Sequence, residues 1–195
     1  MCNFIIRTFD IIISVVAFIL LFPIIFFVSI AVVFDLGFPI FFKQERLGLK
    51  GKKFTIFKFR SMKNEIINVD EYTKVNEYTI KVKDDPRISV VGKFIRNTSL
   101  DELPQLLNVL LGNMSIVGPR PFVPKEYENF PEDWYSRLNC KPGVTGLAQI
   151  RGRSDLPMEK IIESDNEWIE KRSPVVYFRI LIGTLIFILK RKNVY

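Results

Sequence analysis

The stretch IIISVVAFILLFPIIFFVSIAVVF, residues 11–34, places 24 uncharged residues between Asp10 and Asp35. At about 1.5 Å per residue, a helix of this length measures about 36 Å and can cross a hydrocarbon core of about 30 Å. Pro23 lies near its middle, and a proline removes a backbone hydrogen bond and bends a helix. The residues alone leave two geometries open, a bent spanning helix or a re-entrant one. They favour the spanning helix, because membrane helices tolerate proline.

A secretory signal peptide is a poorer interpretation of this segment. The apolar run is longer than the apolar part of a signal sequence, and it continues past a loose cleavage-site pattern at Ser29-Ile30-Ala31. The segment is therefore expected to stay in the protein as a membrane anchor.

The composition of the 195-residue chain excludes several classes of protein. A length of this order predicts one domain with appendages, and 48% apolar residues exclude a disordered chain. The chain has no histidine, which excludes hydrolases that depend on histidine and zinc sites built on imidazole. Any metal would be a hard cation such as Mg²⁺, held by carboxylates. Cys2 and Cys140 form no disulfide framework, so a reducing environment is expected.

Basic residues follow the apolar segment closely and contribute to a formal net charge of +7. Under the positive-inside rule they place this side of the membrane in the cytoplasm, where they would also contact anionic lipid headgroups. They are Lys43, Arg46, Lys50, Lys52, Lys53, Lys58 and Arg60. Beside a membrane anchor, nucleic acid is a minor alternative partner.

The remainder of the chain predicts a small mixed domain. Residues 41–62 are expected to form short strands with a turn at Gly48–Gly51, and residues 64–85 a polar loop. A helix could begin after Gly92, and SLDELPQLLNVLLG, residues 99–112, is the clearest helix because its leucines repeat at helical spacing. The Gly- and Pro-rich stretch 112–124 predicts no regular element, and 140–153 a loop with a short strand. Residues 158–172 predict a polar helix. Residues 180–189 predict a short apolar helix that either packs on the domain or lies in the membrane interface. In the membrane interface, the side chains of Lys190, Arg191 and Lys192 would reach the lipid headgroups.

Asp101 and Glu102 are the first candidates for chemistry. Ser99 and Glu102 have the spacing of a capping box, and acidic residues favour helix N-termini, so a structural role is well founded. The same position suits catalysis, since a helix N-terminus favours an ionised carboxylate and attracts phosphate. An ionised aspartate can attack phosphorus to form an acyl phosphate, and its neighbour could bind Mg²⁺.

Arg120 is the second candidate, because Pro119 and Pro121 fix the backbone on either side of it. A guanidinium matches the oxygens of a phosphate, although an arginine in a rigid surface turn would have the same sequence. Phosphoryl transfer needs an electrostatic clamp of this kind. Further positive charge for the same pocket could come from Lys58, Arg60, Arg87 and Arg96.

The chain resembles the bacterial monotopic phosphoglycosyltransferases, also called polyprenyl-phosphate sugar-1-phosphate transferases. The matching stretches are FFKQERLGLKGKKFTIFKFRSMK, DDPRISVVGKFIRNTSLDELPQLLNVLLGNMSIVGPRP and KPGVTGLAQIRGR, in this order. Together with the membrane segment they cover nearly the whole chain. The resemblance is to the minimal form, without the extra N-terminal helices of larger relatives.

This resemblance implies a two-step reaction. A UDP-sugar would bind with Mg²⁺ at the cytoplasmic face of the bacterial inner membrane, and Asp101 would attack the sugar-bearing phosphate and release UMP. Undecaprenyl phosphate would then accept the phosphosugar, in the first membrane step of capsule, O-antigen, exopolysaccharide or glycoprotein glycan assembly. By the same resemblance Glu102 is a catalytic residue and the Mg²⁺ ligand, and Arg120 contacts the nucleotide or a phosphate.

The resemblance also implies an α+β fold with a re-entrant membrane helix bent at Pro23, against the preference from the residues alone. Residues 1–40 would form this helix, and residues 41–195 a cytoplasmic, membrane-associated catalytic domain with amphipathic interfacial helices. Three positions depart from the family pattern: Phe22 replaces a frequent serine, Arg151 an asparagine and Tyr177 an aspartate.

Two other classes of function remain open at this stage. One is an inactive family member that acts as a membrane scaffold, against which Asp101, Glu102 and Arg120 argue. The other is a membrane-tethered nucleic-acid binder, which we do not expect because the 18 phenylalanines lie largely in apolar segments. The sugar is not specified by the sequence, and a homodimer is left open.

Overall fold

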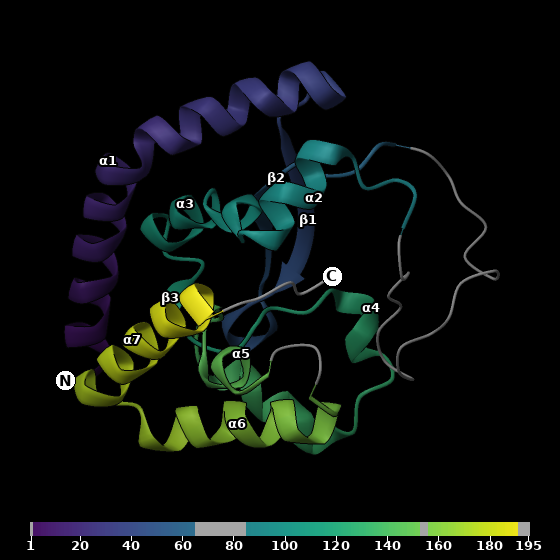
Figure 1. Cartoon of the computed structure of the whole chain (residues 1–195). Coiled ribbons are helices and arrows are strands. Elements are labelled where there is room, and N and C mark those ends of the chain that lie inside the picture. The colour runs from purple at the N-terminus through teal and green to yellow at the C-terminus, as the bar shows by residue number, and fades with distance from the viewer. Residues whose placement is uncertain (1, 65–84, 153–155, 191–195) are drawn as a thin grey trace.

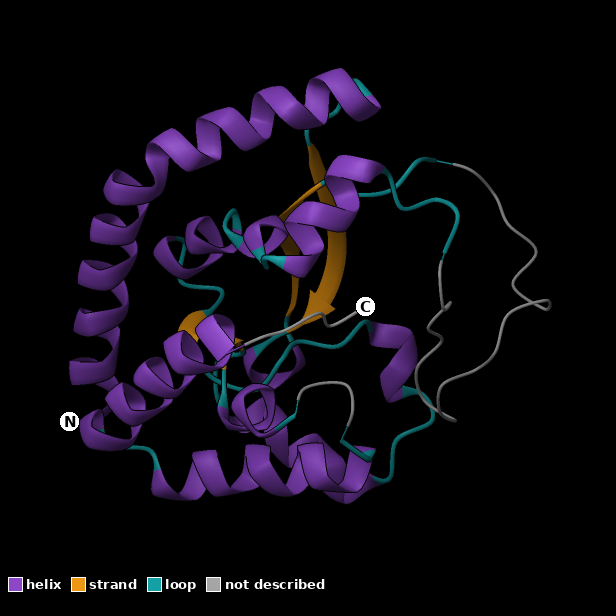
Figure 2. Ribbon diagram, in the orientation of Figure 1, coloured by secondary structure: helices purple, strands orange, loops and turns teal. Residues whose placement is uncertain are grey.

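The computed structural model describes residues 2–64, 85–152 and 156–190, which form helices and two small pairs of strands (Figures 1 and 2). This mixture of helix and sheet confirms the expected α+β class. The loop expected at 64–85 lies outside the described residues except for its two ends, and so do the basic residues 191 and 192.

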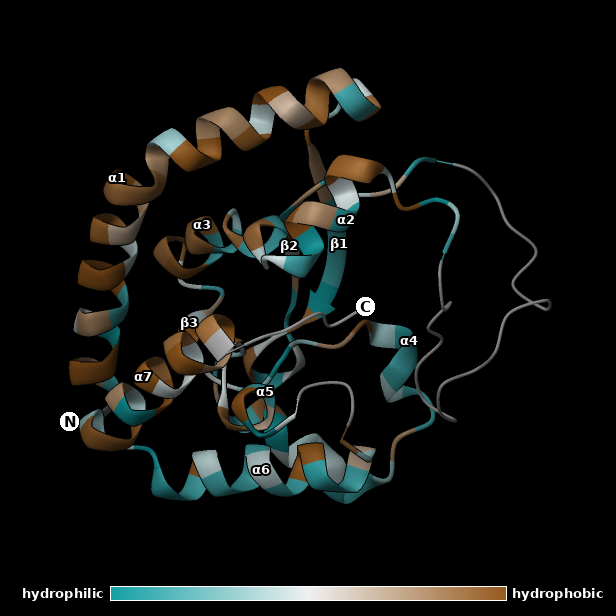
Figure 3. Cartoon of the chain, viewed as in Figure 1, coloured by the Kyte–Doolittle hydropathy of each residue, from teal (hydrophilic) through white to brown (hydrophobic). Residues whose placement is uncertain are grey.

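The apolar segment forms α1 (Cys2–Leu36), a continuous helix that contains Pro23. Residues Asn3–Leu36 are long and apolar enough to cross a membrane. Most large apolar side chains of α1 face outward, and Figure 3 shows their hydrophobic character along the whole helix. An apolar surface of this size is unfavourable in water, so the outer face of α1 is suited to contact with lipid.

Both ends of α1 are attached to the same domain, and the helix changes direction between them (Figure 1). Near its start, the Asp10 carboxylate accepts hydrogen bonds from the Ser115 hydroxyl, the Ile116 amide and the Tyr177 hydroxyl, each at 2.9 Å. At its end, the guanidinium of Arg60 donates to the carbonyls of residues 36, 37 and 38. These contacts fix both termini of the apolar helix on one body.

The strands expected near residues 41–62 are confirmed as an antiparallel hairpin of β1 (Phe41–Leu47) and β2 (Lys53–Phe59). The expected turn contains the short 3₁₀ helix η1 (Leu49–Gly51). Gly51 has a φ of +71°, a conformation that favours glycine at this turn. On β2, Ile56 and Phe59 are buried and attach the hairpin to the core.

The helix expected after Gly92 begins earlier, as α2 (Val90–Asn97). The hydroxyl of Ser89 caps it by accepting a hydrogen bond from the Gly92 amide at 2.9 Å. Gly92 lies so close to the Ser61 carbonyl oxygen that an added Cβ would come within 1.9 Å of it. Glycine is therefore required here for close packing inside the helix.

The prediction of one helix over residues 99–112 is wrong in part. The structure has a 3₁₀ turn, η3 (Leu100–Glu102), and then the short helix α3 (Gln105–Leu110). Pro104 separates them, because a proline has no amide hydrogen to continue the helical pattern. The guanidinium of Arg7 on α1 closes the end of α3 by donating to the carbonyls of residues 109 and 110, at 2.6 and 3.1 Å.

In the Gly- and Pro-rich stretch 112–124, the strand β3 (Ser115–Val117) is contrary to expectation, whereas β4 (Gly143–Thr145) confirms the short strand expected within 140–153. The two strands pair in parallel. Short helices occur at α4 (Pro124–Tyr127), η4 (Glu132–Asn139) and α5 (Leu147–Arg151). An added Cβ at Gly143 would come within 2.1 Å of the Gly118 amide nitrogen. The glycines here allow two backbones to approach closely.

The C-terminal part consists of α6 (Met158–Lys171), which confirms the expected polar helix, and α7 (Pro174–Lys190). α7 is longer than the ten residues expected, and it buries Tyr177 and Ile180 against the core while much of its apolar surface stays exposed. In Figure 3, α7 is largely hydrophobic and α6 largely hydrophilic. The exposed apolar faces of α1 and α7 thus belong to one domain.

Candidate active site

Asp101 and Glu102 lie in η3, between α2 and α3, and the turn is held differently from the prediction. Ser99 has a φ of +59° and its side chain does not cap the turn. The side chain of Glu102 points to cations instead of the Ser99 amide. The predicted capping box is therefore wrong, and the structural role that competed with catalysis loses its main support.

Glu102 is the centre of a charged cluster assembled from three separate parts of the chain. Its Oε1 atom lies 2.8 Å from Nζ of Lys58 on β2 and 3.0 Å from a terminal nitrogen of Arg120. The side chains of Lys58 and Glu102 are only 16% and 17% exposed, while that of Arg120 is 48% exposed. The Lys58 contact is therefore shielded from solvent, whereas about half of the Arg120 side chain is open to solvent.

The environment separates the pKa values of the two adjacent carboxyl groups. Burial by itself raises the pKa of Glu102, but Arg120 and Lys58 outweigh it and hold that pKa well below its usual range. Burial raises the pKa of Asp101, the charge of Glu102 adds to this, and Lys58 opposes it. Glu102 thus stays ionised, while the pKa of Asp101 is shifted upward. Carboxyl groups with separated pKa values are typical of sites that assign them different roles.

The loop that carries Arg120 is held by hydrogen bonds to four successive carbonyls, those of residues 119–122. The Pro119 carbonyl accepts from the Gly143 amide at 2.9 Å, and the Phe122 carbonyl from the Leu47 amide at 3.2 Å. The two carbonyls between them accept from arginine side chains, described next. This loop is fixed by its partners as well as by Pro119 and Pro121.

Two arginines support this loop, although the sequence analysis placed neither of them at the candidate site and expected Arg46 to face lipid headgroups. Arg46 on β1 donates to the Pro121 carbonyl at 3.1 Å. Arg137 on η4 is 2% exposed, donates to the Arg120 carbonyl at 2.8 Å, and lies 3.8 Å from the ring centroid of Phe122. Its charge is paired with Asp165 on α6, at 2.7 Å. No local pattern in the sequence distinguishes these arginines from surface ones.

The structure brings together only some of the predicted binding residues. Lys58 and Arg120 contact Glu102, and the positive charge of Arg96 lowers the pKa of Asp101. Arg60 instead closes the end of α1, and Arg87 forms an ion pair with Asp85 at 2.6 Å.

The carboxyl groups suit a Mg²⁺ ion that binds with a substrate. Mg²⁺ is usually held by one or two carboxylates together with phosphate oxygens and water. Asp101 and Glu102 provide such a pair, and in the described part of the chain no three acidic or cysteine side chains gather into a metal site. The donor set therefore fits a metal shared with a phosphorylated ligand.

The three departures from the family pattern have different surroundings. Tyr177 is fully buried and holds Asp10, so it has a structural role. Arg151 lies 2.7 Å from Glu167 on α6. The side chain of Phe22 is exposed on α1, beside Pro23, and nothing in its contacts explains the departure.

The chain matches the bacterial sugar transferase family over residues 1–191. It is 40% identical to the undecaprenyl-phosphate galactose phosphotransferase of Salmonella typhimurium, over 99% of this chain and 42% of that protein. It is 42% identical to the UDP-glucose:undecaprenyl-phosphate glucose-1-phosphate transferase of Escherichia coli K12, over 90% of this chain and 38% of that protein.

A shorter relative, the exopolysaccharide production protein PSS of Rhizobium leguminosarum, is 39% identical over 95% of both chains. The chain spans about two fifths of the length of the first two relatives. The chain belongs to the bacterial sugar transferase family, which confirms the resemblance carried by its motifs.

Proposed function

We propose that this chain transfers a sugar 1-phosphate from a UDP-sugar to undecaprenyl phosphate, as the first membrane step in assembling a bacterial glycan. The observation that carries the proposal is the position of Asp101, beside a carboxylate that Lys58 and Arg120 keep ionised. The names of the relatives, which include undecaprenyl-phosphate sugar phosphotransferases, support the choice of substrates.

The reaction proceeds in two displacements at phosphorus. A carboxylate oxygen of Asp101 attacks the sugar-bearing phosphorus, the bond from this phosphorus to the bridging oxygen breaks, and UMP leaves with that oxygen. A phosphate oxygen of undecaprenyl phosphate then attacks the phosphorus of the acyl phosphate and releases the Asp101 carboxylate. A covalent intermediate allows a soluble donor and a lipid acceptor to use one site in turn.

Burial of Asp101 favours the first step, because a poorly hydrated carboxylate loses little solvation when it attacks. Arg120 is exposed enough to contact the donor phosphates, and its fixed loop reduces the entropic cost of that contact. Mg²⁺ bound by Glu102, with Asp101 beside it, would neutralise phosphate charge. Lys58 keeps positive charge beside both carboxylates when the substrate is absent.

The two attachments of α1 support a re-entrant placement in the membrane. Asp10 and Arg60 hold opposite ends of the apolar helix to one domain that carries the charged site. A helix that crossed the bilayer fully would place its ends on opposite faces, and one such domain could not hold both. We therefore infer that α1 enters and leaves on the cytoplasmic face of the inner membrane, where basic residues such as Lys43 face anionic lipids.

The test is UMP release from a panel of UDP-sugars, with the full chain in detergent, Mg²⁺ and undecaprenyl phosphate. Release that requires both Mg²⁺ and the lipid, and that is lost in Asp101→Asn, supports the proposal. No release from any UDP-sugar by folded protein would contradict it and would favour a scaffold.

A further inference from the structure

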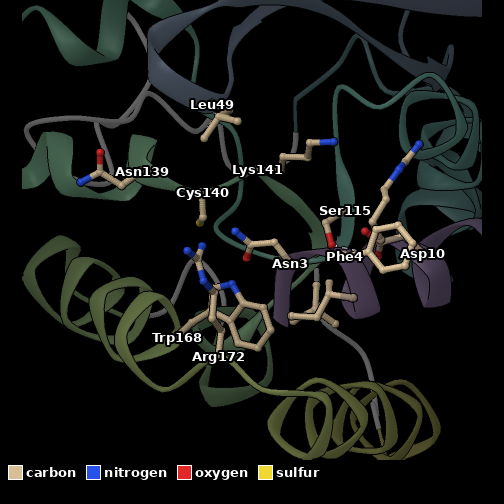
Figure 4. A pocket seen from close by; sticks show the side chains of 13 residues that line it. Asn3, Phe4, Asp10, Leu49, Ser115, Asn139, Cys140, Lys141, Trp168 and Arg172 are labelled. Carbon is tan, nitrogen blue, oxygen red and sulfur yellow. Dashed lines mark hydrogen bonds between the residues drawn. The ribbon is translucent and has the colours of Figure 1, made fainter. Parts of the chain in front are cut away.

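The cavity beside the first turns of α1 lies apart from the charged cluster. Its volume is about 380 Å³, and Figure 4 shows Asn3, Asp10 and Lys141 among the side chains that line it. None of its described lining residues belongs to β2 or to η3. The contacts that hold Lys58 beside Glu102 therefore lie elsewhere, between β2 and α3.

Asn108 on α3 is a polar side chain with no exposed surface, in a helix that otherwise contributes apolar side chains to the core. Its carboxamide makes two hydrogen bonds with the backbone of β2. Nδ2 donates to the Thr55 carbonyl at 2.7 Å, and Oδ1 accepts from the Phe57 amide at 3.0 Å. Burial of a carboxamide costs free energy unless it is hydrogen-bonded, and these two bonds offset that cost. They join α3 directly to β2.

The two bonds occupy the outer edge of β2. This strand pairs with β1 along one edge, and Thr55 and Phe57, two residues apart, present their backbone groups to Asn108 on the other edge. The carboxamide thus takes the place of a peptide group from a third strand. Because it is planar and uses both its donor and its acceptor, β2 cannot slide along α3 without breaking both bonds.

Lys58 is the next residue of β2 after these bonds, and Glu102 lies in the turn that leads into α3. That turn continues into the helix through the hydrogen bond from the Leu106 amide to the Leu103 carbonyl, at 3.1 Å. Asn108 therefore joins the strand that carries Lys58 to the helix that follows Glu102. We propose that Asn108 is a positioning residue that holds Lys58 within reach of Glu102, an inference whose catalytic consequence rests on the proposed function.

Acetylation of lysines by sulfosuccinimidyl acetate, read by mass spectrometry of peptides from the full chain in detergent, reports the position of Lys58 without turnover. Lys58 is shielded and paired with Glu102, so it should react slowly, whereas Lys53 on the same strand is 63% exposed and paired with Glu45 at 2.8 Å. In Asn108→Ala we expect Lys58 to react about tenfold faster, the effect of losing one or two hydrogen bonds of ordinary strength. The rate at Lys53 should stay unchanged. Asn108→Ser is a second variant, and thermal unfolding shows which of the two is folded.

Two control variants separate this effect from a general loss of stability. Asn113→Ala makes the same substitution at an exposed position just beyond α3. Tyr177→Phe removes a hydrogen bond to buried Asp10, which lies on α1 and not on β2. Both variants should keep the native rate of acetylation at Lys58.

UMP release measures the catalytic consequence in the native chain, Asn108→Ala, Lys58→Gln and the double variant. We expect Asn108→Ala to lower kcat/KM for the UDP-sugar about tenfold where Lys58 is present, and by less than about twofold in the Lys58→Gln background. A residue with a structural role alone would lower kcat/KM by the same factor in both backgrounds.

Three results would overturn the proposal. One is native acetylation of Lys58 in a folded Asn108 variant. Another is equal acceleration at Lys58 and Lys53, which would show that the whole hairpin has loosened. The third is an equal loss of kcat/KM in both backgrounds. Absence of UMP release from the native chain would contradict the proposed function alone, because acetylation needs no turnover.

Discussion

Arg137 connects the buried interior to the candidate active site, and its replacement tests whether the fixed loop matters for the reaction. Its side chain contacts the Arg120 carbonyl, the Phe122 ring and Asp165. None of these contacts touches the substrate in the proposed reaction. Arg137 is therefore a positioning residue, and its effect on turnover should be separable from its effect on stability.

The size of each effect follows from burial. In Arg137→Met, Asp165, which is 1% exposed in the native chain, loses its cation, and breaking a buried pair in this way costs about 3–5 kcal/mol of unfolding free energy. Burial raises the pKa of Asp165 to about 6 even though Arg137 lowers it. Without Arg137 this pKa should rise further, and uptake of a proton by Asp165 would relieve part of the cost. In Arg137→Met/Asp165→Leu no buried charge is left, and the free energy of unfolding should return to within about 2 kcal/mol of the native value.

The double variant still lacks the hydrogen bond to the Arg120 carbonyl. We expect kcat/KM for the UDP-sugar to fall about tenfold, which corresponds to about 1.4 kcal/mol of transition-state binding. Thermal unfolding in detergent and UMP release are measured on the wild-type chain and on the single and double variants. If the double variant has both native stability and native kcat/KM, the positioning role of Arg137 is wrong. If both quantities fall together in the double variant, its role is structural.

Three further predictions concern individual side chains. Asp101→Asn should reduce turnover by at least about a thousandfold. Its free energy of unfolding should change by less than about 1 kcal/mol, because burial already disfavours the charged form of Asp101. Retained turnover would exclude Asp101 as the nucleophile. Lys58→Gln removes a charge that lowers the pKa of Asp101. The acid limb of the pH–rate profile, where turnover falls as Asp101 is protonated, should therefore move to higher pH. An unchanged acid limb would assign this limb to another group. Tyr177→Phe removes a hydrogen-bond donor to buried Asp10 and should lower the free energy of unfolding by about 1–3 kcal/mol. UMP release per folded molecule should stay unchanged. Native thermal stability of the variant would contradict the structural role of Tyr177.

The membrane helix and the hairpin could be predicted because each has a strong local signal. A run of 24 uncharged residues predicts α1, and the turn at Gly48–Gly51 with the alternating stretch KFTIFKF after it predicts the hairpin of β1 and β2. The predicted helix over 99–112 failed at Pro104, where the leucine spacing continued but the backbone hydrogen bonds could not. The strand β3, which was not expected, has three residues, too few to show a period.

The site was predictable only as a set of candidates. Asp101, Glu102 and Arg120 stand in patterns with a physical meaning, and the structure brings Glu102 and Arg120 into contact. The sequence could not tell that Arg60 binds the end of α1, because a charge carries no information about its partner. Arg137 was missed for the same reason, since its partner Asp165 is distant in the sequence.

The most direct test of the central claim is to look for the covalent intermediate on Asp101. The full chain is mixed with Mg²⁺ and its UDP-sugar without undecaprenyl phosphate, and the intact protein and its peptides are weighed by mass spectrometry. The account predicts one sugar phosphate per chain on the peptide that contains Asp101, with no more than one UMP released per enzyme, and its disappearance when undecaprenyl phosphate is added. An unmodified chain that releases UMP only when the lipid is present, or an adduct on Glu102, would contradict it.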